Sequence, residues 1–250
     1  GNIASTSGFT LTTLKGGDLA LLSNGDITWD GGSLATPSGS VQMSADGSIA
    51  VTGALSSPVD LALSSKIAIN VNGSVSTSGT GTTAFTAPSL VINGSVNAAD
   101  DVGIIADAIN LGAGSRTGAG HDVIIAAANV TATNATVTAV HDISAAITGD
   151  LRLNGSGFTA GNDIFLNLMG ASSTLYLNDV TGLSRSFLWA QAPATIHLDF
   201  PARDADGMVV DGVAVDPLKF AAVADGSGLF YGAAMAPASL GSGLEVSYTY

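Results

Sequence analysis

The chain has 250 residues and carries 7 Lys and Arg residues against 20 Asp and Glu residues, a formal net charge of −13. The basic residues are scattered singly, and phosphate binding needs a concentrated basic face, so we expect no nucleic-acid partner and no anionic membrane partner. No apolar run approaches the ~18 residues of a membrane-spanning helix, which predicts no membrane insertion.

The composition is typical of an all-β protein. Every acidic residue except Glu245 is an aspartate, and the helix formers Glu, Lys, Arg and Gln are scarce. Gly, Ser, Thr, Asn, Val and Ile are abundant instead, as strands and turns require. There is no cysteine, which excludes disulfides and thiolate metal sites. A long stacked β array can bury a sufficient core without disulfides.

Short strand-like segments follow one another along the first two thirds of the chain. Within each segment apolar residues alternate with small or polar ones, which indicates a strand with one buried face. The segments are 17–21, 25–29, 39–43, 47–51, 59–63, 66–70, 89–93, 94–98, 108–112, 121–125, 129–133, 135–139, 141–145, 149–153 and 162–166.

The spacing of these segments predicts the fold class. Leu19 lies 22 residues before Val41, which lies 20 residues before Leu61. Ile143 lies 20 residues after Val123 and 21 residues before Ile164. This period favours an all-β, parallel β-helix of about 20–22 residues per coil, with Leu, Ile, Val and Ala stacked inside. The alternative is a β-sandwich, but the chain lacks the series of two-residue hairpin turns that a sandwich favours.

The chain divides into two predicted regions. Residues 1–183 form a β-helix shaft, about eight or nine coils and about 40 Å long at the usual strand spacing. Segments 76–84 and 112–120 interrupt the rhythm and are predicted to be loops that leave the rod and make contacts. Residues 184–250 hold most of the aromatic residues and lose the repeat. They are predicted to form a C-terminal β capping domain, because a solenoid end exposes strand edges and core.

The repeat pattern resembles a known family. Residues 123–166 (VIIAAANVTATNATVTAVHDISAAITGDLRLNGSGFTAGNDIFL) resemble the shaft of filamentous-haemagglutinin-type exoproteins. Residues 196–217, together with GSGLF and GSGLEVSY, resemble the end that closes some members. The family's amino-terminal Asn-Pro-Asn-Gly-type secretion signature has no match. The resemblance implies a right-handed parallel β-helix, two-partner secretion through an outer-membrane partner, and adhesion at the bacterial cell surface.

The stretch TGAGHDVIIAA, residues 117–127, is close to one unit of a calcium-binding β-roll. Such rolls need tandem nonapeptides, because adjacent turns share each ion. Only one looser match follows, at 155–166. Asp122 is therefore predicted to fix the corner by accepting hydrogen bonds from turn N–H groups. No cofactor is expected, and calcium at Asp122 and Asp163 is the alternative.

Enzymatic activity is not expected. A polysaccharide-active β-helix enzyme would need clustered carboxylates with basic partners on one face. One local group of this composition occurs, and it leaves a polysaccharide lyase or hydrolase as the alternative. The group consists of Asp100, Asp101, Asp107, Arg116, His121 and Asp122.

His121 and His141 each precede an aspartate at the start of a strand and lie 20 residues apart. On a 20-residue coil they should stack one above the other. They are interpreted as polar corner residues in register, with a metal-binding pair as the alternative.

Trp189, Phe230 and Tyr231 are the candidate binding residues. Aromatic rings offer flat surfaces on which sugars stack, although such residues also form the core of a small domain. The predicted function is that of a non-enzymatic extracellular adhesin or structural filament fragment, whose stalk mediates attachment, self-association or biofilm contacts. Host or matrix glycans and proteins are the expected partners.

Overall fold

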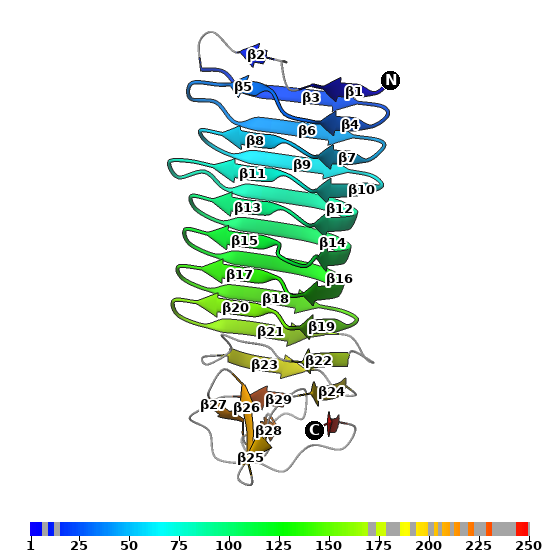
Figure 1. The fold of residues 1–250 in the computed structure, drawn as a ribbon, viewed down its shortest axis with the longest axis vertical. Coiled ribbons are helices and arrows are strands. Elements are labelled where there is room, and N and C mark those ends of the chain that lie inside the picture. The colour runs from blue at the N-terminus through cyan, green and yellow to red at the C-terminus, as the bar shows by residue number, and fades with distance from the viewer. Residues whose placement is uncertain are drawn as a thin grey trace.

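The computed structural model describes residues 1–6, 10–12, 16–169 and 174–178. Further along it describes the strands at 186–190, 194–199, 203–204, 207–210, 213–215, 220–222, 229–231 and 244–249. The described chain winds into a parallel β-solenoid of about eight turns (Figure 1). Among these residues there is no helix long and apolar enough to cross a membrane.

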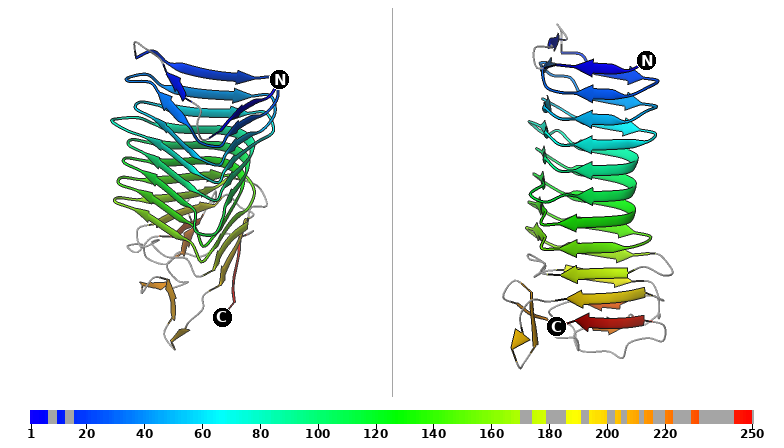
Figure 2. Two further views of the ribbon diagram at one scale, coloured as in Figure 1. Left: turned by 45° about the horizontal axis from the view of Figure 1, so that its top comes forward. Right: turned by 45° about the vertical axis from the view of Figure 1, so that its right-hand side comes forward.

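Each coil contributes strands to three columns that run the length of the rod (Figure 2). The first column holds β3 (Leu19–Ser23), β6 (Val41–Ala45), β9 (Leu61–Ser65), β18 (Ile143–Ile147), β21 (Ile164–Leu168) and β23 (Ser186–Ala190). The second column holds β1 (Ile3–Ser5), β4 (Ile27–Trp29), β7 (Ile49–Val51), β10 (Ala68–Val71), β19 (Leu151–Asn154), β22 (Thr174–Asn178), β24 (Ala194–Asp199) and β30 (Leu244–Thr249). Three long strands bend from the first column into the second: β12 (Thr83–Ile92), β14 (Val102–Leu111) and β16 (Val123–Thr133).

The third column completes each coil. It holds β2 (Thr10–Thr12), β5 (Ser33–Ala35), β8 (Ala54–Ser57), β11 (Ser74–Thr77), β13 (Ser95–Ala98), β15 (Arg116–Ala119), β17 (Thr136–Ala139) and β20 (Gly157–Ala160). Within the described residues, strands pair in parallel in all three columns, each with its counterpart one coil away. This pairing excludes the β-sandwich, whose neighbouring strands would run in opposite directions.

The register confirms the period predicted from the sequence. Leu19 pairs with Val41, and Val41 pairs with Leu61. Further along, Ile143 pairs with Val123 on one side and with Ile164 on the other. Intervals of 20–22 residues are therefore one complete coil, because they bring the same position back to the same column.

Aliphatic side chains fill the interior, as predicted. In the first column Leu63, Phe85, Ile104 and Ile125 stack in register, and each is at most 2% exposed. The second and third columns add buried aliphatic residues of their own, among them Val71 and Val96. A single coil cannot bury these residues alone, so the stability of each coil depends on its neighbours.

The corner between the second and third columns needs a left-handed backbone conformation. Gly114 and Gly155 adopt positive φ values of 79° and 57° there. Asn134 lies between them in the stack and has a φ of 47°. Asparagine tolerates this conformation better than most side-chain-bearing residues, so the same turn is kept over three coils.

The two segments predicted to be loops that leave the rod are mostly part of it. In 76–84 the chain leaves β11 and enters β12 through a short turn, in which Gly81 N donates to Ser78 O at 3.1 Å. In 112–120 residues 116–119 form β15, paired on both sides in the third column. The prediction of projecting loops was wrong for 116–119, where pairing on both sides of β15 imposes a strand, and 76–84 contains only a short turn between two strands.

Parallel pairing continues beyond residue 183. Strand β23 pairs with β21, β24 with β22, and β30 with β24. The chain segment that connects β24 to β30 contains two small antiparallel sheets. They consist of β25 (Arg203–Asp204), β26 (Gly207–Val210) and β27 (Val213–Val215), and of β28 (Phe220–Ala222) and β29 (Leu229–Tyr231). The division of the chain at 183/184 remains a prediction.

Candidate functional site

Aspartates line the corner that precedes the first column, which we call the first corner. Each carboxylate accepts a hydrogen bond from the backbone N–H at the same position one coil further on. Asp18 Oδ1 accepts from Ser40 N at 2.8 Å, and Asp60 Oδ1 accepts from Thr82 N at 2.9 Å. The donor therefore belongs to the next coil, not to the aspartate's own turn as the sequence suggested.

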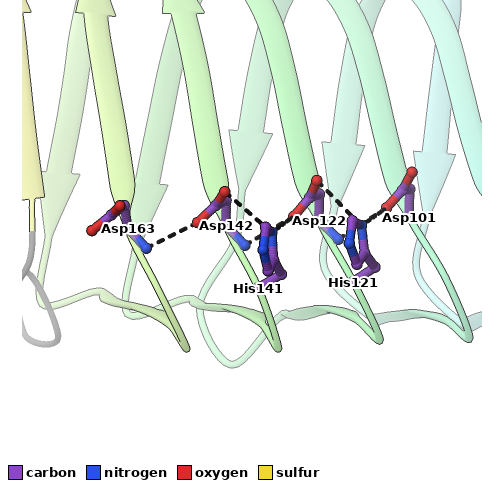
Figure 3. Close-up of polar contacts among 6 residues, drawn as sticks. All are labelled: Asp101, His121, Asp122, His141, Asp142 and Asp163. Atoms are coloured by element: carbon purple, nitrogen blue, oxygen red, sulfur yellow. Dashed lines mark hydrogen bonds and ion pairs between the residues drawn. The ribbon is translucent and has the colours of Figure 1, made fainter.

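In the second half of the rod the same bonds form a continuous ladder (Figure 3). Asp101 Oδ1 accepts from Asp122 N at 2.9 Å, and Asp122 Oδ1 accepts from Asp142 N at 2.9 Å. Asp142 Oδ1 in turn accepts from Asp163 N at 3.0 Å. Four carboxylates thus follow one another at the spacing of single coils. Hydrogen bonds to charged acceptors contribute more than neutral ones, so each link stabilises coil stacking.

The two histidines insert between these carboxylates. His121 Nδ1 lies 3.1 Å from Asp101 Oδ1 and 3.2 Å from Asp122 Oδ2. His141 Nδ1 lies 3.0 Å from Asp122 Oδ1 and 3.2 Å from Asp142 Oδ2. Each imidazole therefore bridges two successive aspartates (Figure 3). We call these five residues, together with Asp163 at the end, the His–Asp ladder.

The imidazole rings stack as the 20-residue interval predicted. Their centroids are 4.7 Å apart and their planes differ by 6°. The stacking follows from the backbone, because His141 N donates to His121 O at 2.9 Å across the coil boundary. The side chains are half-exposed, at 51% for His121 and 45% for His141. Within the described residues, Nδ1 is the ring atom that hydrogen-bonds to the carboxylates. Because the rings are half-exposed, the outer side of the site is open to solvent.

The ladder shifts the pKa values of two of its members. The hydrogen bond to Asp101 raises the pKa of His121 above its ordinary value, partial desolvation opposes this, and nearby carboxylates add to the rise. Partial burial acts to raise the pKa of Asp122, but hydrogen bonds from Asp142 N and His141 outweigh it and hold that pKa below its usual range. Both shifts favour the charged forms that attract each other.

The group suggested for catalysis is divided by the structure. Asp100, Asp101, His121 and Asp122 lie along the first corner. Asp107 lies within the bent strand β14, and Arg116 begins β15 in the third column. Arg116 was expected in a loop, and its position in a strand is a further correction. The described residues therefore bring the carboxylates to histidines, not to the arginine.

Asp122 and Asp163, the alternative calcium ligands, lie two coils apart with Asp142 between them. Asp122 is instead close to His121 and His141, and the three offer ligand atoms within 4.8 Å of one another. The 20-residue period predicted the stacking of His121 and His141, and the structure adds Asp122 between them.

The aromatic candidates lie in strands near the end of the rod. Trp189 is in β23, and its backbone pairs with Asn167. Phe230 and Tyr231 are in β29, which pairs with β28 and lies beside β23. Their side chains are outside the described part of the structure, so their binding role remains a prediction.

The first column presents a second surface of interest. Its outward positions from residue 20 to residue 167 include no Asp, Glu, Lys or Arg. Ile105, Ile124 and Phe165 are 60%, 47% and 41% exposed on this side. Large exposed apolar residues in a group often mark contact surfaces. We define the apolar face by these three residues and the outward alanines of the same column: Ala62, Ala84, Ala126 and Ala146.

Comparisons with protein-family models, with curated proteins and with solved structures found no match for this chain. The assignment of a parallel solenoid therefore depends on the strand pairing alone. The resemblance to filamentous-haemagglutinin-type proteins is an expectation from the sequence pattern, and the fold is compatible with it.

Proposed function

We propose that this chain is a non-enzymatic shaft segment of an extracellular adhesin or structural filament, displayed at the bacterial surface after two-partner secretion. The apolar face is the observation that carries the proposal. The chain has a formal charge of −13, and its aspartates between residues 16 and 169 lie at corners and bends, which leaves the outward side of the first column uncharged. Such a side can lie against another surface without bringing carboxylates together.

The contrast with the other two sides supports a contact role. Outward residues of the second column include Asn70, Asn110 and Thr131. Those of the third column include Asn97 and Thr138. The first column also carries outward polar residues such as Gln42 and Ser64, but it lacks the charged residues of the other two sides, Arg152 and Arg116. An uncharged side with exposed apolar residues suits a partner.

The size of the apolar face suits weak, repeated contacts. Strands of about five residues in the six coils from β9 to β21 cover about 500 Å² at the usual strand dimensions. Two such faces together would bury about 1,000 Å², at the lower end of specific interfaces. A single contact of this size is weak, but many parallel rods on one surface would multiply it. Lateral association of shafts is therefore the contact that we favour, with matrix glycans and proteins as further partners.

Sedimentation velocity on the full chain tests this proposal. The double substitution Ile105→Asp, Ile124→Asp should abolish concentration-dependent association, and the same chain should attach less to a glycan and matrix-protein array. The matched control is Asn110→Asp, Thr131→Asp, which adds the same charge to the second column. Equal association of the two double variants would contradict a role for the apolar face. Release of reducing or unsaturated ends from uronate polymers would contradict the non-enzymatic proposal.

A further inference from the structure

The His–Asp ladder holds two imidazoles and a carboxylate that can exchange their mutual hydrogen bonds for bonds to a metal ion. His121 and His141 direct their Nδ1 atoms at the same carboxylate from opposite sides, at 3.2 and 3.0 Å from Asp122 oxygens. The three ligand atoms lie within 4.8 Å of one another. Two imidazoles and one carboxylate are a ligand set that transition-metal ions take in proteins.

From this arrangement we propose that His121, Asp122 and His141 form a binding site for a late first-row divalent transition-metal ion: Cu²⁺, Ni²⁺ or Zn²⁺. The site is independent of the apolar face, which lies on the outside of the first column.

The three side chains can converge on one ion once the rings turn. The rings stack with centroids 4.7 Å apart, so the two Nδ1 lone pairs do not meet at one point in the present rotamers. Metal–imidazole bonds of ~2.0–2.1 Å lie in the ring plane, so rotation of the half-exposed side chains must bring both Nδ1 atoms toward the ion. Water can occupy the remaining positions on the open side.

Neighbouring groups favour a cation at this point. Asp101 lies on one side of the site and Asp142 on the other, each within 3.2 Å of an imidazole nitrogen of the pair. The ion would take the place of the Nδ1 protons, and each neutral imidazole would then carry its proton on the exposed Nε2. Flanking carboxylates lower the energy of a divalent ion by electrostatic attraction.

The donor types select the class of ion. Imidazole nitrogen suits Cu²⁺, Ni²⁺ and Zn²⁺, whereas Ca²⁺ takes six to eight oxygen ligands. The affinity of a nitrogen and oxygen site for divalent first-row metals generally rises from Ni²⁺ to Cu²⁺ and falls again at Zn²⁺. The expected order of affinity is therefore Cu²⁺ first, then Ni²⁺ and Zn²⁺, with Ca²⁺ far weaker.

Titration of the full chain with each metal alone tests the proposal. Isothermal titration calorimetry should show one Zn²⁺ per chain, and Cu²⁺ should give an electron paramagnetic resonance spectrum with coupling to two nitrogens. His121→Asn and His141→Asn should each weaken Zn²⁺ binding at least tenfold. Asparagine keeps a side-chain N–H donor beside the carboxylate, and Asn162 already occupies the equivalent position one coil on. These variants should therefore fold. His197→Asn is the control and should bind like the parent.

A gain-of-function variant makes the test independent of any loss of folding. Asn162→His places a third imidazole one coil beyond His141, with Asp142 between the two. In the His121→Asn chain it should restore the binding of one ion, because His141, Asp142 and the added imidazole repeat the ligand set of the parent. The proposal is overturned if the parent binds no Zn²⁺ or Cu²⁺, if the His121 and His141 variants bind like the parent, or if Asn162→His restores no binding to the His121→Asn chain.

Discussion

The two halves of the first corner hold their coils together in different ways. In the first half, carboxylates alternate with hydroxyl residues in successive coils: Asp18, Ser40, Asp60 and Thr82. In the second half, every coil from Asp101 to Asp163 carries a carboxylate. Carboxylates one coil apart are separated by about 5 Å and repel each other, whereas those two coils apart approach the ~8–10 Å over which salt screens charge.

The residue before each aspartate explains the difference. In the first half it is glycine in three of four coils, and a Cβ on Gly39 or Gly81 would collide with the backbone of the preceding coil. In the second half the glycine of two coils is one residue earlier, at Gly120 and Gly161, which frees the next position for a side chain. His121 follows Gly120 and Asn162 follows Gly161, while the second imidazole, His141, follows Val140. The comparison teaches that consecutive carboxylates are accompanied by a group that can balance their charge.

The largest expected effect separates the two halves directly. Asp122→Ala should lower the free energy of unfolding by about 2–3 kcal/mol, because Asp142 N and His141 both lose a charged acceptor. Asp60→Ala should cost about 1 kcal/mol, because the bond from Thr82 N is lost. Urea denaturation measures both. Asp122→Asn, which keeps an acceptor oxygen, should fall between them, and equal losses for the two alanine variants would contradict the comparison.

A second effect concerns the coil where the two halves meet. Thr83 occupies a first-column core position between Leu61 and Val102, and its buried Oγ1 has no hydrogen-bond partner. Thr83→Val should raise the free energy of unfolding by about 1 kcal/mol, since it removes an unsatisfied hydroxyl and keeps the shape. Thr138→Val, at an exposed position of the third column, is the control and should change stability little. A loss of stability in Thr83→Val would show that the hydroxyl has a role.

Much of the fold was predictable from the sequence because coil stacking repeats the same environment. Leu19, Val41 and Leu61 recur at one-coil intervals since each must fill the same interior position. Strand β15 was missed because its inward residues are Thr117 and Ala119, which lack the aliphatic pattern. Its pairing on both sides supplies the stability that its own side chains do not.

The candidate site was predictable only in part. The 20-residue interval placed His121 above His141 correctly, because register depends on spacing. The bonds from each aspartate to the next coil were missed, because a short Gly-x-Asp or His-Asp motif looks the same whether its acceptor serves its own turn or a neighbour. The sequence therefore predicts which residues lie above one another in the rod better than it predicts their hydrogen-bond partners.

A smaller effect should appear when the first half is given consecutive carboxylates. Thr82→Asp places a carboxylate between Asp60 and Asp101 in a coil where Gly81 provides no imidazole. The repulsion should cost about 0.5–1 kcal/mol at low salt and less at high salt, because exposed charges are screened. Urea denaturation at two salt concentrations measures it. An additional Gly81→His substitution should not rescue the loss, since a Cβ there collides with Val59 O.

The smallest effect is a difference in pH dependence between the ladder and a corner that carries arginine. Partial burial acts to raise the pKa of Asp150, but the hydrogen bond from Arg152 at 2.9 Å lowers it below the ordinary 3.8. A lowered aspartate pKa gives stability that is present above pH 3.8 and lost as the pH falls. Arginine stays charged throughout this range. Arg152→Gln should therefore lower the stability at neutral pH and make the loss of stability at acid pH smaller than in the parent.

The ladder should also lose stability on the alkaline side. The raised pKa of His121 gives stability that is fully present below pH 6.5 and lost as the pH rises through the raised value. In EDTA the melting temperature of the parent should therefore decrease as the pH rises from 6 to 9. His121→Asn should remove part of that decrease and leave the loss of stability at acid pH unchanged. Arg152→Gln should keep the alkaline fall. The melting midpoint of the parent could instead stay constant above pH 6, or His121→Asn could leave its decrease unchanged. Either result would mean that the imidazole does not balance the charge of the carboxylates. The two halves of the first corner would then differ in their hydrogen bonds alone.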